Sequence, residues 1–426
     1  MKALKTFLAS LTTCVLLTSC GTDTNILGES QGKISTFSTE KDENTILLEN
    51  LNKSIDIATS TKNTLNNYNI KFLMDGKNAF PAIENLIKTA KKSIYIEVFL
   101  FHDDYTGKKF SELLSQKAKQ GLDVRLVYDF TGNSKVKLIS DMAKNGVKVQ
   151  TFNKDVFGKV GVNITHRKMF IADGEKAITG GMNIGENYEY DWHDTMVYYE
   201  GEAVKDTIRE FIADWKLAGG TTFSYAMEEY LYKEFPKKDG VKTYPIRVAV
   251  TSPKEQGKKV QLKRMFLSAI DNAKKNIKVA MPYFSDDEFI NHLIAAKQRG
   301  VDVKALMPYK SDQKLFDAMG TITTNQLVEA GIDVYRTGFK SGKFSHSKIM
   351  TIDDAWATIG SCNADARAFH DNQEFNVAIS DVAFAQEVNK TFFDYHIQDS
   401  AKGVFKKVPW YKKQTYSFLE EMDYLI

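Results

Sequence analysis

One domain-sized unit occurs twice in this chain of 426 residues, and this repeat constrains the fold more than any other feature. Residues 90–98 match residues 273–281, because in both segments a helical pattern ends in lysines and a short apolar run follows. Two further pairs of segments match in the same order, namely 120–125 with 299–304 and 145–149 with 330–334. Self-similarity at this scale predicts two similar structural units in one chain.

Both copies alternate helical patterns with short runs rich in Val, Ile, Leu and Tyr. This alternation predicts an α/β fold with a mostly parallel or mixed sheet. A shift in composition over residues 217–244 indicates the joint between the copies. We therefore expect a first domain over residues 68–220, a linker over 221–243 and a second domain over 244–426.

The N-terminus has the pattern of an export signal over residues 1–19, with a basic start and an apolar run at 6–17. That run is shorter than the roughly 20 residues that a permanent membrane-spanning helix needs. The sequence Leu17-Thr18-Ser19-Cys20 resembles a bacterial lipobox, whose cysteine is acylated and becomes the first residue of the mature chain. The alternative is a plain secretory signal with a chance cysteine.

The segment over residues 20–67 is polar, and we expect it to tether the lipid to the folded body, with a short helix around 46–58. An ordinary N-terminal extension is the alternative. Because Cys14 would leave with the signal and Cys20 would carry lipid, Cys362 would be alone, and no disulfide is expected. The aromatic and basic stretch over 403–426 could pack on the body or lie on a membrane surface.

Each copy carries one histidine-lysine-aspartate pattern in which four residues separate the lysine from the aspartate. The six residues are His166, Lys168 and Asp173 in the first copy and His346, Lys348 and Asp353 in the second. An asparagine and a carboxylate then follow each histidine at equal spacings, and they are Asn183 and Asp194 in the first copy and Asn363 and Glu374 in the second. Four kinds of polar group that recur at equal spacings indicate a common chemical role.

Elementary chemistry explains these residue types. If the His-x-Lys segment is a strand, both side chains point to one face. One histidine nitrogen can attack phosphorus while the second histidine protonates the leaving alcohol. Lysines and asparagines can stabilise charge on the phosphoryl oxygens, and a carboxylate can orient each imidazole.

Other readings of the motifs are weaker. Each histidine alone is more often structural than catalytic, although the paired set argues against a purely structural role. A zinc site is disfavoured, because HExxH is absent, cysteines are few and the lysine beside each histidine would repel a cation. We expect no metal and no cofactor, since the lysines supply the positive charge. The other histidines have no counterpart in the second copy and are expected to be surface or locally hydrogen-bonded residues, namely His102, His193, His292, His370 and His396.

The duplicated motif resembles that of the phospholipase D superfamily, in which two α/β/α sandwich domains related by a pseudo-two-fold axis share one active site. The resemblance implies that His166 and His346 are nucleophile and general acid/base, with His166 the nucleophile by family habit, although the symmetry of the sequence leaves that choice open. Lys168, Lys348 and the two asparagines would bind phosphate. Asp194 and Glu374 would each support the other copy's histidine, and Asp173 and Asp353 match motif aspartates that are mainly structural in the family.

Within the superfamily the chain is most similar to bacterial cardiolipin synthase, on the motifs at 179–185, 192–195, 211–215, 282–284 and 360–374. That resemblance implies transfer of a phosphatidyl group between two phosphatidylglycerol molecules through a phosphohistidine. The N-terminus departs from the family, which typically has membrane-spanning helices there, and Ala368 stands where serine is usual.

Three other functions remain open at this point. They are a phospholipase D that hydrolyses phospholipids to phosphatidic acid, a nuclease-like phosphodiesterase, and a lipid-binding scaffold without turnover. The near balance of 57 basic and 54 acidic residues argues against a nucleic-acid partner. We expect an exported lipoprotein of the cell envelope, anchored through Cys20, which binds phospholipid and could hold a complete site as a monomer.

Overall fold

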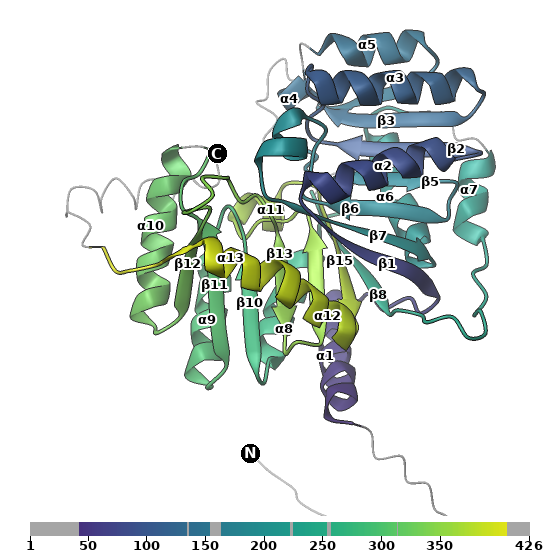
Figure 1. The fold of residues 1–426 in the computed structure, drawn as a ribbon. Helices are drawn as coiled ribbons and strands as arrows, with labels where there is room; N and C mark the ends of the chain where they lie inside the picture. The colour runs from purple at the N-terminus through teal and green to yellow at the C-terminus, as the bar shows by residue number, and fades with distance from the viewer. Residues whose placement is uncertain are drawn as a thin grey trace, which may run out of the picture. The chain divides into compact units, whose positions relative to one another are not determined.

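The computed structural model describes residues 42–133, 136–153, 163–221, 225–253, 257–312 and 314–406. Figure 1 shows how the elements of this part are arranged. The predicted export signal, the lipidation site at Cys20 and residues 407–426 of the aromatic C-terminal stretch lie outside the described residues.

The first domain is built on a seven-stranded mixed sheet with strand order β1-β7-β6-β5-β2-β3-β4. Its strands are β1 (Asn67–Met74), β2 (Ser93–Val98), β3 (Asp123–Asp129), β4 (Lys148–Phe152), β5 (Met169–Ala172), β6 (Lys176–Gly180) and β7 (Thr195–Gly201). Its helices are α2 (Gly76–Thr89), α3 (Tyr105–Lys119), α4 (Phe130–Asn133), α5 (Lys137–Lys144), the π-helix η1 (Asn187–Asp191), α6 (Ala203–Leu217) and α7 (Tyr225–Tyr232).

The second domain has a nine-stranded sheet with the order β16-β12-β11-β10-β13-β14-β15-β8-β9. Its strands are β8 (Ile246–Ser252), β9 (Lys259–Val260), β10 (Asn276–Ala280), β11 (Asp302–Pro308), β12 (Asp333–Thr337), β13 (Ile349–Ile352), β14 (Trp356–Gly360), β15 (Glu374–Ser380) and β16 (Ala401–Lys402). Its helices are α8 (Gln261–Asn272), α9 (Asp287–Gln298), α10 (Lys314–Glu329), α11 (Ala366–His370), α12 (Val382–Val388), the π-helix η3 (Asn389–Phe393) and α13 (Asp394–Asp399).

The two sheets repeat one topology, as the internal repeat predicts. In each, three strands run parallel (β2, β3 and β4; β10, β11 and β12), and an antiparallel set joins them through β5 or β13. Short β9 and β16 extend the second sheet at its two edges. The prediction of a duplicated α/β fold with mixed sheets is confirmed.

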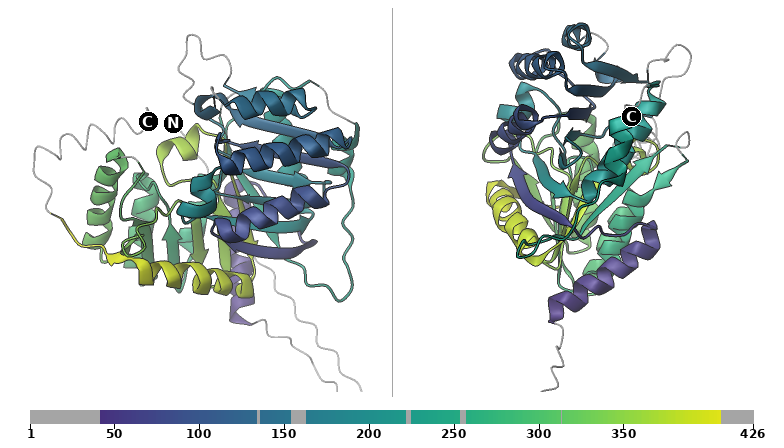
Figure 2. Two further views of the ribbon diagram at one scale, coloured as in Figure 1. Left: turned by 45° about the horizontal axis from the view of Figure 1, so that its top comes forward. Right: turned by 90° about the vertical axis from the view of Figure 1, so that its right-hand side faces the viewer.

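One hydrophobic core lies between the two sheets and joins the domains. It combines side chains of both, among them Met169 and Val197 of the first sheet and Ile349 and Phe375 of the second. Helices α2, α3 and α5 cover the opposite face of the first sheet, and α8, α9 and α10 that of the second (Figures 1 and 2). The shared core therefore fixes the two motif-bearing sheets against each other.

The predicted tether and linker both contain packed structure. Residues 43–59 form helix α1 (Glu43–Thr59), which packs on α8 and buries Leu51 and Ile55 in the core of the second domain. Helix α7 lies inside the predicted linker, and Tyr230 on it is buried and bonded to Ser93 at 3.0 Å. Both segments carry apolar side chains that a solvated connection would leave in water.

No helix in the described residues combines the length and the apolar character that crossing a bilayer requires.

Candidate active site

The two His-x-Lys segments lie just before strands β5 and β13 rather than inside them, which differs from the strand expected for them. Each segment is held by a backbone hydrogen bond to the other copy. The amide of His166 donates to the carbonyl of Gln373 at 2.9 Å, and the amide of His346 donates to that of His193 at 2.7 Å. Each motif segment therefore pairs with the residue that precedes the other copy's carboxylate.

This pairing brings each histidine to a carboxylate of the other copy. Nδ1 of His166 lies 2.9 Å from Oε1 and 3.1 Å from Oε2 of Glu374. Nδ1 of His346 lies 2.8 Å from Oδ2 of Asp194. All four side chains are buried, and a carboxylate at Nδ1 fixes the ring orientation and stabilises the imidazolium.

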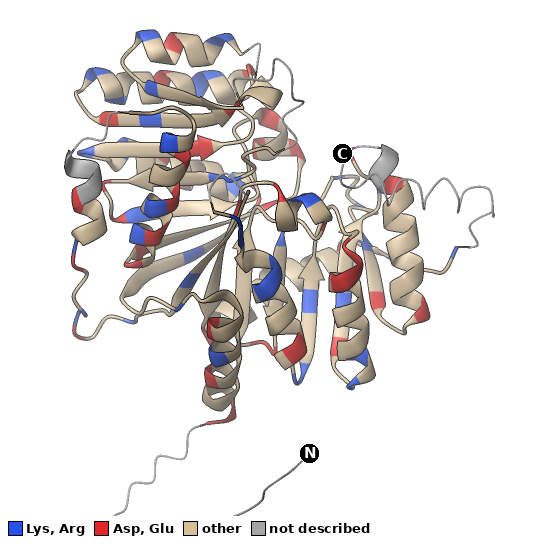
Figure 3. Cartoon of the chain, turned by 180° about the vertical axis from the view of Figure 1, so that it is seen from behind, with Lys and Arg blue, Asp and Glu red and all other residues tan. Residues whose placement is uncertain are grey.

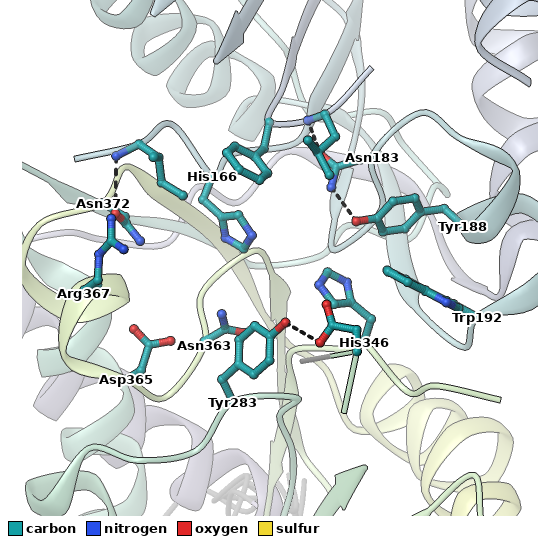
Figure 4. Close-up of a pocket in the computed structure, with 14 residues that line it drawn as sticks. His166, Asn183, Tyr188, Trp192, Tyr283, His346, Asn363, Asp365, Arg367 and Asn372 are labelled. Carbon is teal, nitrogen blue, oxygen red and sulfur yellow. Dashed lines mark hydrogen bonds between the residues drawn. The ribbon is translucent and has the colours of Figure 1, made fainter. Parts of the chain in front are cut away.

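The two histidine rings face one cavity of about 280 Å³ between the domains (Figure 4). Its wall consists of Phe99, Leu100, Ile164, His166, Asn183, Tyr188, Trp192, Tyr283, Asp312, His346, Asn363, Asp365, Arg367 and Asn372. In Figure 4, Tyr188 and Trp192 lie on the His346 side, and Arg367 and Asn372 lie on the His166 side. The predicted histidines and asparagines thus meet in one pocket.

The motif lysines are fully buried behind the histidines. Nζ of Lys168 donates to the backbone carbonyl of His166 at 2.5 Å, and Nζ of Lys348 donates to that of His346 at 2.6 Å. Nζ of Lys348 also lies 2.8 Å from Nε2 of His346. Burial lowers the pKa of both lysines, and for Lys348 the pKa falls to about 8.

Burial also changes the pKa values of the crossed pairs. It lowers the pKa of His166 well below the usual range and that of His346 to about 4, with the neighbouring lysines adding to both shifts. It raises the pKa of Glu374 to about 8, so that near neutral pH the ring of His166 stays neutral. Neutral rings have a nitrogen lone pair that can attack an electrophile or take up a proton.

The asparagines of the motifs differ in their hydrogen bonds. Oδ1 of Asn183 accepts from the amide of Leu100 at 3.0 Å, while its Nδ2 donates to the hydroxyl of Tyr188 at 2.8 Å. Oδ1 of Asn363 is buried and has no hydrogen-bond partner within the part of the chain that the structure describes. Both line the pocket, where amide groups can donate to phosphoryl oxygens.

The motif aspartates do not line the pocket. Asp173 accepts hydrogen bonds from the backbone amides of residues 91–93, and Asp353 from those of residues 274–276, at 2.6–3.1 Å. Both have a positive φ, 54° and 55°, at the turn after the motif strand. In the structure they brace the start of β2 and β10.

Sequence reasoning missed several residues of the site. Ser361 donates a hydrogen bond to Oε2 of Glu374, and its counterpart Gly181 lies against Asp194. Gly181 and Ser361 each directly follow one of the matching glycines, Gly180 and Gly360. This equal spacing could have identified Ser361 from the sequence. Tyr283 donates to Asp312 at 2.7 Å at the pocket wall, and no repeated spacing marks that pair.

Two further histidines are buried, and for His396 the expectation of a surface or locally hydrogen-bonded residue was wrong. Nδ1 of His193 lies 3.0 Å from Asp75, as a local hydrogen bond requires. His396 packs 4.8 Å from the His193 ring, and neither of its ring nitrogens bonds to any residue that the structure describes. Burial lowers the pKa of His396 to about 3, so this ring is a neutral packing residue.

Comparison with known proteins gives the same two units. The family model described as "Cardiolipin synthase, PLD-like domain" matches residues 83–215 and 266–396. A cardiolipin synthase of Halalkalibacterium halodurans is 33% identical over an alignment of 327 positions, which covers 72% of this chain and 62% of that protein. Cardiolipin synthase 1 of Staphylococcus aureus (strain MRSA252) is 31% identical over an alignment of 350 positions, which covers 76% of this chain and 67% of that protein. The chain thus spans less than two thirds of the length of the first of these relatives.

Among solved structures, phosphatidylserine synthase of Haemophilus influenzae has a TM-score of 0.64 at 16% identity, covering 89% of this chain and 97% of that one. That likeness concerns the fold alone. The crossed histidine–carboxylate pairs, the repeated topology and the family match over both copies lead to one conclusion: the chain belongs to the phospholipase D-like family of cardiolipin synthases.

Proposed function

We propose that the protein is a phosphatidyltransferase that converts two molecules of phosphatidylglycerol into cardiolipin and glycerol. The observation that carries this proposal is the pair of crossed histidine–carboxylate contacts, which turn two rings from two copies toward one pocket. The relatives that share the family are cardiolipin synthases by name. A nucleophile and a proton donor are what a phosphodiester exchange needs, and the two histidines can supply both. The reaction needs no other energy source, because the bond from phosphorus to histidine replaces the ester bond that breaks.

The first step forms a phosphohistidine. Nε2 of His166 attacks phosphorus, the bond from phosphorus to the glycerol oxygen breaks, and His346 gives that oxygen a proton. A bound phosphodiester anion raises the pKa of both rings, because its negative charge favours the imidazolium form. His346 can then carry the proton that the leaving oxygen requires, and Asp194 stabilises the charged ring.

The second step reverses the first with a new alcohol. The terminal hydroxyl of a second phosphatidylglycerol gives its proton to His346 and attacks phosphorus, and the bond between nitrogen and phosphorus breaks. We assign the phosphoryl oxygens to Asn183 and Asn363, which line the pocket, with Lys168 and Lys348 buried behind the histidines as the source of positive charge. The lysines supply positive charge to the phosphoryl group, and the residues present account for both steps.

We also infer that the chain is an exported lipoprotein of the cell envelope, anchored through Cys20, and that one chain forms a complete site. The export pattern of residues 1–20 supports the anchor. An anchor of this kind would keep the pocket at the membrane that contains its substrate. Exchange of phosphodiesters needs no ATP, which suits a reaction outside the cytoplasm.

Hydrolysis is the second candidate, because water at the phosphohistidine would give phosphatidic acid with the same residues. A nuclease-like activity is less well supported, since acidic and basic residues are interspersed along the helices and strands (Figure 3). Backbone recognition of nucleic acid favours a continuous basic surface.

Product analysis by mass spectrometry tests the proposal. Protein without residues 1–20 is mixed with phosphatidylglycerol vesicles in EDTA, next to a His166→Ala variant. Cardiolipin and glycerol, both absent with the variant, are the expected result. Phosphatidic acid alone would make the protein a phospholipase D. Absence of any lipid product would overturn both lipid activities, and cleavage of DNA or of bis-p-nitrophenyl phosphate would then be measured.

A further inference from the structure

The outer edge of the second sheet contains a hollow that is separate from the catalytic pocket. It has a volume of about 440 Å³ and lies between the segments that follow β11 and β12, helix α10 and the chain after β16. Its lining includes Tyr309, Phe339, Lys310, Lys402, Val404 and Lys406. We call this set the edge hollow.

Apolar side chains at the rim of the edge hollow stand in solvent. Tyr309 and Phe339 form an edge-to-face ring pair with centroids 4.9 Å apart, and they are 41% and 49% exposed. Val404 is 57% exposed, and the adjacent Phe405 is 52% exposed. Leaving such side chains in water costs free energy, and clustered exposure of this kind marks an interaction surface.

The same hollow is basic. No carboxylate of the described residues forms an ion pair with Lys310 or Lys406. Lys402 pairs with Asp333 at 2.5 Å, although both side chains are about half exposed, so solvent screens that pair. The one acidic residue of the wall, Asp317, accepts from the backbone amide of Ser311 at 2.6 Å.

Arg336 forms the floor with a guanidinium already held by the protein. It donates to the carbonyl of Pro308 at 3.0 Å and to the hydroxyl of Thr324 at 3.1 Å. Its charge is thus fixed in place, and the flexible lysines around it can reach a ligand.

Two short segments connect the edge hollow to the catalytic pocket. One runs from Tyr309 to Asp312, which lines the pocket beside Tyr283. The other runs from Phe339 to Phe344, whose ring packs 5.0 Å from Trp192 of the pocket wall. Both segments follow the carboxyl ends of parallel strands, and such ends meet at one edge of a sheet.

We propose that the edge hollow docks on an anionic phospholipid membrane, with lipid phosphates among its lysines and the aromatic pair in the interface. Tyrosine and other aromatic rings concentrate at membrane interfaces, and lysines can extend their charges to the headgroups along apolar stems. Exposed valine and phenylalanine fit lipid better than nucleic acid. The choice of phospholipid rests on the proposed function, and the surface would hold the pocket close to its substrate.

Vesicle binding tests this proposal in protein without residues 1–20, so that neither the export signal nor an acyl group contributes. One variant combines Tyr309→Ala with Phe339→Ala, and another combines Lys310→Glu with Lys406→Glu. Control variants are Tyr232→Ala, an 82% exposed tyrosine on α7, and Lys237→Glu on the exposed segment after it. Sedimentation with phosphatidylglycerol vesicles should show at least about tenfold weaker partitioning for both test variants, since each basic residue at an anionic surface adds to binding. The control variants should partition like the parent.

A second arm separates docking from catalysis. Activity on short-chain phosphatidylglycerol below its micelle concentration should stay within about twofold of the parent for the test variants, while activity on vesicles falls. Unchanged vesicle binding by both test variants would overturn the proposal. Equal loss of binding to phosphatidylcholine vesicles would overturn the assignment of anionic headgroups. Binding to duplex DNA that the same substitutions abolish would assign the hollow to nucleic acid instead. Absence of cardiolipin with either substrate, with vesicle binding intact, would overturn only the proposed function.

Discussion

The two carboxylates that hold the histidines differ in length, and the residue behind each differs with them. A β-carbon at Gly181 would lie 2.2 Å from Oδ1 of Asp194, so only glycine leaves room for the aspartate there. At the matching position Ser361 instead donates to Glu374, whose longer chain gains a second anchor. The two halves of the site therefore reach one ring geometry by different side chains.

Glu374→Gln tests the crossed contact at the residue scale. The amide keeps the size of the carboxylate but cannot balance the charge on the His166 ring, so we expect kcat to fall by about 10²–10⁴-fold with little change in the folded structure. Initial rates of product formation measure this effect. The exposed Glu387→Gln serves as control and should leave the rate unchanged. A Glu374→Gln rate close to that of the parent would remove the carboxylate from the mechanism.

The low pKa of Lys348 predicts an alkaline limit to activity. Because burial lowers this pKa to about 8, the ammonium loses its proton as pH rises through that value, and the site then loses a positive charge that attracts phosphate. We expect kcat/KM to fall above about pH 8. In Lys348→Arg the guanidinium stays charged, so any remaining activity should no longer decrease above about pH 8. If the decrease in kcat/KM persisted in the arginine variant, the titration of another group would have to cause it.

At the scale of elements, helix α1 extends the second domain with a segment that precedes the first. Asp42 caps it by accepting from the amide of Thr45 at 3.1 Å, and Leu51 and Ile55 face the core beside α8. Asp56 forms an ion pair with the buried Arg247 of β8. The described part of the chain thus starts on the second domain with α1, then forms the first domain, and then forms the rest of the second domain.

Substitutions on the buried face of α1 should lower the free energy of unfolding more than substitutions on its exposed face. Leu51→Ala should lower the free energy of unfolding by about 2–5 kcal/mol, because it removes buried methyl groups and leaves a cavity. Ile57→Ala, on the same helix but 76% exposed, should change it by less than about 0.5 kcal/mol. Chemical denaturation of the two variants measures the difference. Equal and small effects would mean that α1 adds little to the second domain.

How far the sequence predicts this structure depends on whether a residue repeats. His166 and His346, Asn183 and Asn363, and Asp194 and Glu374 occur at equal spacings, so their side chains could be assigned to one constellation before any coordinates. Helix α1 has no counterpart in the other copy, and its apolar positions gave only a short helix inside a polar segment. Arg367, Tyr283 and Asp312 reach the pocket only through tertiary packing, which no local pattern encodes.

At the scale of the whole molecule, the shared core fixes the two motif-bearing sheets against each other within one chain. Strands β6 and β7 of the first sheet and β14 and β15 of the second pack face to face, and this packing sets each motif beside the other copy's carboxylate. In each histidine–carboxylate pair, one domain provides the histidine and the other provides the carboxylate. Neither domain alone therefore contains a complete pair.

This arrangement predicts that specific activity does not depend on protein concentration. Both crossed pairs form within one chain, so dilution should not dismantle the site, whereas a site shared between subunits would lose activity below its dissociation constant. Rates per milligram, measured on short-chain monomeric substrate from nanomolar to micromolar protein, should stay constant, and light scattering should give the mass of one chain. A drop in specific activity on dilution, together with a dimer mass, would mean that a second chain supplies part of the working site. Mixing His166→Ala with His346→Ala gives the matched control, because two chains that each lack one histidine should not restore activity if every site is built within a single chain.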